Sequence, residues 1–208
     1  MIKKLCGRII YRFIPLCFSQ PFFKIFGGLE VKGIKNIPRK GGIIIAPNHL
    51  SYVDPPLLAT VITGGCRFMA RHELFDIPVL KHIVSYYAFP VKRQNPGASS
   101  IKRAIRELAE GMIVVIFPEG SRNISASRLQ PKNGIGMIAS ICKVKIVPAL
   151  IEGTDKLLPQ GALLPRPAKI RVTFGMPIDV SEAGNDYENI GQYIMDRIKD
   201  ISKYSMDE

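Results

Sequence analysis

The sequence predicts an α/β domain in which a mainly parallel central sheet of about seven strands is flanked by helices, with an N-terminal amphipathic helical segment ahead of it. Two observations predict this class. Short apolar runs rich in β-branched residues alternate with longer segments of helical periodicity, which is typical of parallel sheets covered by helices. The chain has 208 residues, 47% of them hydrophobic, which is enough to bury one sizeable core.

Seven apolar runs are expected to form the strands. They cover residues 29–32, 43–46, 67–70, 88–91, 113–117, 145–150 and 169–174. The clearest helix is expected over residues 99–110, with Glu107 on its polar face, and the last over residues 185–202, where isoleucines recur at helical spacing. A shorter helix is expected over residues 55–63, and the proline- and glycine-rich stretch 159–167 is expected to be a long loop.

Residues 1–28 are expected to form a segment of their own, followed by a domain over residues 29–208. A helix over residues 2–13 would have an apolar arc of about 140°. Its opposite face carries four basic side chains, Lys3, Lys4, Arg8 and Arg12, and five phenylalanines occur by residue 26. This pattern favours a segment lying in the membrane interface, with its basic side chains toward anionic headgroups. The alternative is a helix that packs on the core and leaves its lysines in water.

Charge is distributed unevenly along the chain, whose formal net charge is +12. Residues 1–50 contain nine basic groups and one acidic group, a net of +8, whereas residues 171–208 contain four basic and eight acidic groups, a net of −4. The N-terminal part therefore favours an anionic partner, which could be nucleic acid or an anionic membrane surface. The sequence contains no recognisable nucleic-acid module, so we expect no nucleic-acid partner.

No segment has the roughly twenty uninterrupted apolar residues of a membrane-spanning helix. We therefore expect a peripheral protein on the cytoplasmic face of a membrane, without a transmembrane span. The four cysteines lack metal-ligand spacing and suit reduced thiols, and His72 and His82 have no ligand neighbours at suitable spacing. We expect neither a metal site nor another cofactor.

The run from Asn48 to Pro55 places His49 and Asp54 five residues apart after an apolar stretch. An imidazole accepts protons near pH 7, and a carboxylate on its other nitrogen fixes the tautomer. In a continuous helix these two side chains would point about 140° apart, so the helix must be broken between them. Pro55 supplies the break, and Asp54 is expected to be the N-cap of the following helix. The spacing alone leaves two alternatives, a proton-transferring pair or a helix cap beside an ordinary loop histidine.

Two further strand ends carry residues suited to anion binding. Lys92 and Arg93 follow the strand at 88–91, and the sequence Pro-Glu-Gly-Ser-Arg at 118–122 follows the strand at 113–117. Ligands of open α/β sheets bind where the strands end, so both loops are expected to converge with His49 on one crevice. Arginine binds phosphate oxygens in a bidentate way. The simpler alternatives are a solvated cation at Arg93 and a local ion pair between Glu119 and Arg122.

Taken together, these blocks resemble the lysophospholipid acyltransferase family, the 1-acylglycerol-3-phosphate acyltransferases. Residues 48–54 match the family's histidine and aspartate motif, and residues 117–123 match its third block fully. Residues 87–93 match its second block, except that Tyr87 stands where glycine is usual. Residues 146–150, 153–154 and 175–178 resemble its fourth block, so the resemblance covers residues 30–178.

The resemblance implies transfer of a fatty acyl group from acyl-CoA or acyl carrier protein to the free hydroxyl of a lysophospholipid. The expected acceptor is 1-acylglycerol-3-phosphate, which would give phosphatidic acid. His49 would be the general base and Asp54 would orient it. The sequence does not identify the donors that would stabilise the oxyanion.

The remaining site residues would bind substrate. Three basic side chains, Lys92, Arg93 and Arg122, would hold the acceptor's phosphate, and the pocket around it would be shaped by Glu119, Gly120 and Ser121. Ser51 would be a loop or acceptor-binding residue, and a nucleophilic Ser51 is the alternative.

Three other functions stay open on the sequence. They are an acyltransferase for another lysolipid, a non-catalytic membrane lipid-binding protein of the same fold, and a hydrolase of acyl thioesters or esters. A lipid-binding protein would not need both His49 and Asp54, so their joint presence favours an enzyme.

Overall fold

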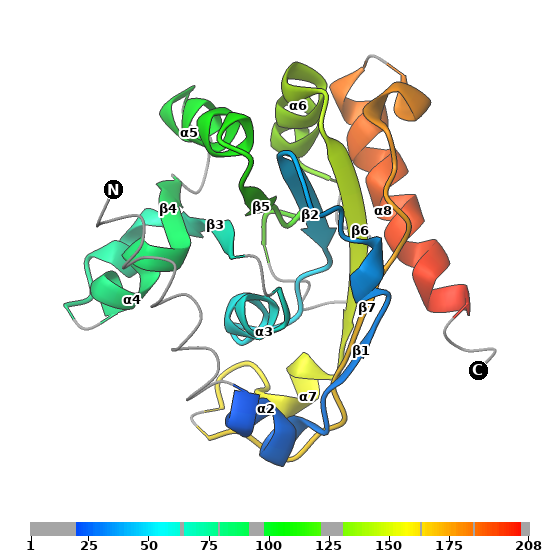
Figure 1. Cartoon of the computed structure of the whole chain (residues 1–208). Coiled ribbons are helices and arrows are strands. Elements are labelled where there is room, and N and C mark those ends of the chain that lie inside the picture. Colours follow the sequence, from blue (N-terminus) through cyan, green and yellow to red (C-terminus); the bar gives the residue numbers. More distant parts are fainter. Residues whose placement is uncertain are drawn as a thin grey trace.

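The computed structural model describes residues 20–62, 65–78, 80–91, 98–121, 131–162, 164–184 and 186–204. A seven-stranded sheet lies at the centre, in the order β1-β7-β6-β2-β5-β3-β4 (Figure 1). The strands are β1 (Glu30–Lys32), β2 (Ile43–Pro47), β3 (Cys66–Arg71), β4 (Ala88–Val91), β5 (Ile113–Val115), β6 (Lys145–Glu152) and β7 (Arg171–Phe174).

Helices cover both faces of this sheet (Figure 1). The α-helices are α2 (Gln20–Gly27), α3 (Asp54–Val61), α4 (Leu80–Tyr87), α5 (Ala98–Ala109), α6 (Asn133–Cys142), α7 (Thr154–Leu157) and α8 (Tyr187–Tyr204). Short 3-10 helices cover Ile34–Asn36, His72–Phe75 and Val180–Ala183. The predicted α/β fold with a mainly parallel sheet of seven strands is confirmed.

Strand β2 is central and pairs in parallel with β5 on one side and β6 on the other. Only the β6–β7 pair is antiparallel. The chain leaves β6 through α7 and a loop, and it enters β7 from the same edge of the sheet without a crossover. A connection of this kind reverses the strand direction, which the sequence pattern did not reveal.

Residues of β2 alternate between two cores, one on each face of the sheet. Ile43 and Ile45 pack with α3 and α2, whereas Ile44 and Ala46 pack with α5, α6 and α8. Both sets are buried. This period of two on a strand covered on both faces explains why the whole run is apolar, and it fixes the end of β2 rigidly in the middle of the fold.

The two predicted long helices are confirmed, with one correction. In α8, Ile190, Ile194 and Ile198 form the expected buried stripe. In α5, Glu107 was expected on the polar face, and this was wrong because it is buried. Arg103 one turn away donates from Nε to its carboxylate over 2.7 Å, and this pairing satisfies the buried charge.

The two strands that pair with β2 end at residues other than the expected ones. Strand β5 ends at Val115 rather than at residue 117, because Phe117 turns away to stack on His49. Strand β6 continues to Glu152, because it pairs with β7 as far as the pair of Glu152 and Arg171.

Helix α2 is the first part of the chain that the structure describes. Its Phe23 is buried in the core beside the sheet, while Ile25 is 74% exposed. The predicted interfacial residues Lys3, Lys4, Arg8 and Arg12 lie outside the described residues, so the interface segment and the division at residue 28 stay predictions. Within the described part of the chain, no helix is both long and apolar enough to cross a bilayer.

Candidate active site

Asn48 ties the loop that leaves β2 to the neighbouring strand β6. Its side-chain Nδ2 donates to the carbonyl of Ile151 over 2.9 Å, and its Oδ1 accepts from the backbone N–H of Ile151 over 2.6 Å. The amide therefore replaces a peptide group and extends the β2–β6 ladder by one pair. This pairing therefore fixes the position of the backbone just before His49.

Asp54 lies at the first turn of α3, and its side chain is fully buried. A single oxygen, Oδ2, accepts from the backbone N–H groups of Leu50 over 2.7 Å and of Ser51 over 2.8 Å. The same oxygen lies 2.8 Å from Nδ1 of His49. These three contacts satisfy Oδ2 and hold the carboxylate against the imidazole, whereas Oδ1 is buried and has no hydrogen-bond partner among the described residues.

The expectation that Asp54 caps α3 was wrong. Val53 occupies the N-cap position, and no side-chain hydrogen bond caps the helix there. The carboxylate instead turns back and accepts from the loop before the helix, so that the loop closes around it. Pro55 and Pro56 follow in the first turn, where a missing backbone N–H costs little.

The imidazole of His49 is held on a second side by Phe117. The two rings stack with centroids 4.1 Å apart and planes inclined by 25°. The His49 side chain is 17% exposed. With Nδ1 bonded to Asp54, the ring presents Nε2 to a substrate, as a general base requires.

Glu119 follows β5, the strand beside β2, and only 3% of it is exposed. Its carboxylate accepts a hydrogen bond from the backbone of His49, which lowers its pKa. Burial is the larger effect and raises the pKa to about 7, with a further rise from the negative charge of Asp54. Glu119 therefore touches the same histidine loop as Asp54, from the next strand.

The turn after Glu119 requires a glycine. Gly120 has a φ of 64°, a left-handed conformation, and a Cβ there would come within 2.8 Å of Cγ of Lys132. Ser121 is the last described residue before a gap and is half-buried. The backbone N–H of Lys132 donates to Pro118, so the chain returns to the same turn after the gap.

Ser51 is buried, and its Oγ donates to the carbonyl of Leu158 over 3.1 Å. This bond uses the hydroxyl proton to fasten the histidine loop to the segment after α7. Ser51 therefore occupies a structural position in the loop, and a nucleophilic role would require that bond to break.

The predicted phosphate-binding residues Lys92, Arg93 and Arg122 lie outside the described residues. Their strands can still be placed. β5, which leads toward Arg122, pairs directly with β2, whereas β4, which leads toward Lys92 and Arg93, lies three places from β2 across β5 and β3. All four strands run in parallel, so their carboxyl ends share one edge with His49.

No three His, Cys, Asp or Glu side chains in the described ranges come together in a way that could hold a metal ion. Cys66, the first residue of β3, is buried, and burial raises the pKa of its thiol. The expected absence of a metal and of other cofactors stays a prediction.

Sequence reasoning assigned no role to Asn48 or Phe117. Each stands at the end of a buried strand and next to a reactive motif. An amide that ends an apolar strand can continue its ladder, and an aromatic ring before the Pro-Glu-Gly turn can reach the neighbouring loop, so both positions offered a usable signal.

Comparisons with known proteins identify the family. The Acyltransferase family model matches residues 28–152, which is more than half of the chain. A crystal structure of the 1-acyl-sn-glycerophosphate acyltransferase of Thermotoga maritima has the same fold, with a TM-score of 0.81 over 98% of this chain and 83% of that chain at 24% identity.

Curated relatives point the same way. The chain is 35% identical to a 1-acyl-sn-glycerol-3-phosphate acyltransferase of Bacillus subtilis over 73% of this chain and 74% of the relative. It is 29% identical to a chloroplast enzyme of the same name from Arabidopsis thaliana, but it spans only 46% of that protein's length. The chain therefore belongs to the acyltransferase family and is an acyltransferase.

Proposed function

We propose that this protein transfers a fatty acyl group from an acyl thioester to the free hydroxyl of 1-acylglycerol-3-phosphate, which gives phosphatidic acid. The single observation that carries the proposal is the His49–Asp54 pair, 2.8 Å apart, with the aspartate buried and the imidazole reaching the surface. The names of the relatives support the choice of acceptor.

The chemistry follows from the free nitrogen of the imidazole. Nε2 of His49 takes the proton of the acceptor hydroxyl while its oxygen attacks the thioester carbonyl, and the carbon–sulfur bond then breaks. The departing thiolate accepts the proton from the imidazolium, so the base is restored. Buried Asp54 stabilises the imidazolium that forms between these steps. A base held in this way contributes about 10²–10⁴-fold to the rate.

Arg93 and Arg122 are proposed to hold the acceptor's phosphate, with Lys92 adding positive potential. Phosphate bound at a fixed distance from His49 selects which hydroxyl reaches the base. The parallel strands before these residues support this role, because β4 and β5 both end at the edge of the sheet where His49 lies.

The donor is proposed to be acyl-CoA or acyl carrier protein, both of which are acyl thioesters. The setting is proposed to be the cytoplasmic face of an anionic membrane, with residues 1–28 in its interface. The net charge of +8 over residues 1–50 supports this location.

His49→Ala should reduce transfer to lysophosphatidic acid by at least about 10²-fold, because it removes the imidazole that Asp54 orients. The rate of phosphatidic acid formation, read by mass spectrometry of the lipid, measures this change. His72→Ala is the matched control, since His72 is half exposed and pairs only with its neighbour Glu73 among described residues. If His49→Ala forms phosphatidic acid at the wild-type rate, His49 is not the general base.

Glu119 should make stability depend on pH. Because its pKa rises from 4.5 to about 7 on folding, the folded state binds more protons between these values, and the free energy of unfolding falls as pH rises through that window. Glu119→Gln should remove this loss. As the pH rises from 5 to 8, the free energy of unfolding of Glu119→Gln should increase relative to that of wild type by on the order of 1–3 kcal/mol.

Urea unfolding at the two pH values measures the Glu119 effect. Glu110→Gln, an exposed substitution just after α5, is the control and should change little with pH. An equal pH dependence in wild type and Glu119→Gln would contradict the assignment.

Arg122→Ala should mainly weaken use of the acceptor. Loss of a bidentate phosphate contact should raise the apparent KM for lysophosphatidic acid by roughly tenfold or more, and Arg122→Lys should recover only part of it. Arg106→Ala, which removes an exposed cation of α5, is the control. If acceptor KM and kcat both stay unchanged in Arg122→Ala, the phosphate role is wrong.

A further inference from the structure

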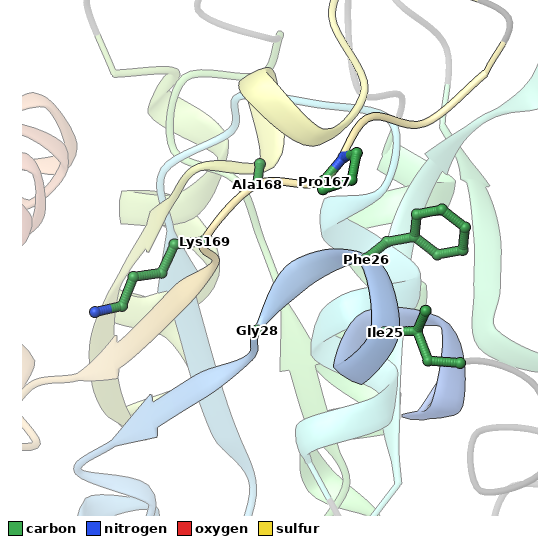
Figure 2. Close-up of a pocket in the computed structure, with 6 residues that line it drawn as sticks. All are labelled: Ile25, Phe26, Gly28, Pro167, Ala168 and Lys169. Atoms are coloured by element: carbon green, nitrogen blue, oxygen red, sulfur yellow. The ribbon is translucent and has the colours of Figure 1, made fainter.

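The end of helix α2 adjoins the segment over residues 164–169, and we call the two together the α2–loop surface. The backbone N–H of Ala168 donates to Phe26 over 2.9 Å, and that of Ile170 donates to Gly27 over 2.7 Å. Figure 2 shows Ile25 and Phe26 of the helix beside Pro167 and Ala168 of the loop. An open depression of about 370 Å³ lies between them, and Lys169 and Gly28 complete its lining.

This surface exposes large apolar side chains to water. Ile25 is 74% exposed and Leu164 is 77% exposed. Single exposed apolar residues are ordinary, but here they belong to two segments joined by hydrogen bonds, and Ile25 also lines the open depression. Apolar side chains exposed on two adjoining segments favour a contact with a partner or a lipid surface.

Basic side chains accompany the apolar ones. Lys24, Arg166 and Lys169 are all exposed. Lys24 and Arg166 have no ion pair with an acidic residue in the described part of the chain. Lys169 lies 3.9 Å from Glu30, whose carboxylate is held more closely by Arg171 at 3.0 Å. The α2–loop surface therefore keeps a positive charge beside its apolar side chains.

The α2–loop surface is also connected to the histidine loop. The backbone N–H of Arg166 donates to the carbonyl of Leu157. The carbonyl of Leu158 accepts a hydrogen bond from the hydroxyl of Ser51. The described residues 158–162 and 164–169 thus contact the His49 loop at one end and α2 at the other. Figure 1 shows α2 and α7 grouped beyond the carboxyl end of β2.

We propose that the α2–loop surface contacts an anionic lipid bilayer, so that residues 164–169 are a second membrane contact beside the N-terminal segment. Exposed apolar side chains flanked by cations match the acyl boundary and headgroups of such a bilayer. The basic amphipathic pattern of residues 2–13 lies six residues before α2 in the sequence and combines the same apolar and basic side chains. This contact presents the His49 edge of the sheet to lipid, and it rests on the proposed function only in that the acceptor is a lipid.

The test uses tryptophan, which the chain lacks. Leu164→Trp in the full chain should show a blue-shifted emission on addition of equimolar phosphatidylcholine–phosphatidylglycerol vesicles, and brominated acyl chains should quench it. Met176→Trp is the matched control. Met176 is 70% exposed, but it follows β7, which runs away from the His49 edge, so its emission should not change.

Charge reversal gives an independent measurement. Arg166→Glu should lower partition onto these vesicles by roughly tenfold or more, because each basic residue near an anionic surface contributes about a factor of five. Lys145→Glu makes the same charge change at the opposite edge of the sheet, at the start of β6. Its partition onto the vesicles should stay near that of wild type.

Ile25→Trp separates the two membrane contacts. If its emission shifts while that of Leu164→Trp does not, the proposal is wrong and the N-terminal interface stands. Equal responses at positions 164 and 176 also overturn the proposal, as does a response of Leu164→Trp to acyl carrier protein but not to vesicles. A shift at position 164 in a protein without transfer activity would refute the proposed function alone.

Discussion

One oxygen of Asp54 organises the loop on which the chemistry depends. It accepts two backbone N–H groups and lies 2.8 Å from the imidazole of His49, while the whole side chain is buried. A buried carboxylate without such partners would be strongly unfavourable. The loop must therefore close around Asp54 for the protein to fold, and closure of the loop also aims the histidine. Folding and the proposed proton transfer therefore use the same contacts.

The rest of the sheet supports this loop from three sides. Asn48 fastens it to β6, Ser51 fastens it to the segment after α7, and Phe117 from the end of β5 covers one face of the imidazole. Glu119 reaches its backbone from the same strand end. Each support comes from a strand or segment beside β2, which explains why the site needs a central parallel strand with partners on both sides.

The fold and the contact between His49 and Asp54 could be predicted from the sequence because they rest on local signals. Apolar runs of strand length alternate with helical stripes, and His49, Asp54 and Pro55 lie within one turn-forming run. The antiparallel β7 could not be predicted in this way, since its direction depends on a long loop. The buried Glu107 and the carboxylate that turns away from its helix depend on partners distant in space or on exact loop geometry, and periodicity carries no information about either.

We propose that Asp54 keeps the proton of neutral His49 on Nδ1 and leaves Nε2 free to act as a base. Nitrogen-15 NMR of histidine-labelled protein measures this directly, because the chain has three histidines and the His49→Ala spectrum assigns the signal. At a pH where the imidazole is neutral, we predict the proton on Nδ1 in wild type and its redistribution in Asp54→Asn. A wild-type His49 that carries its proton on Nε2 would contradict the account.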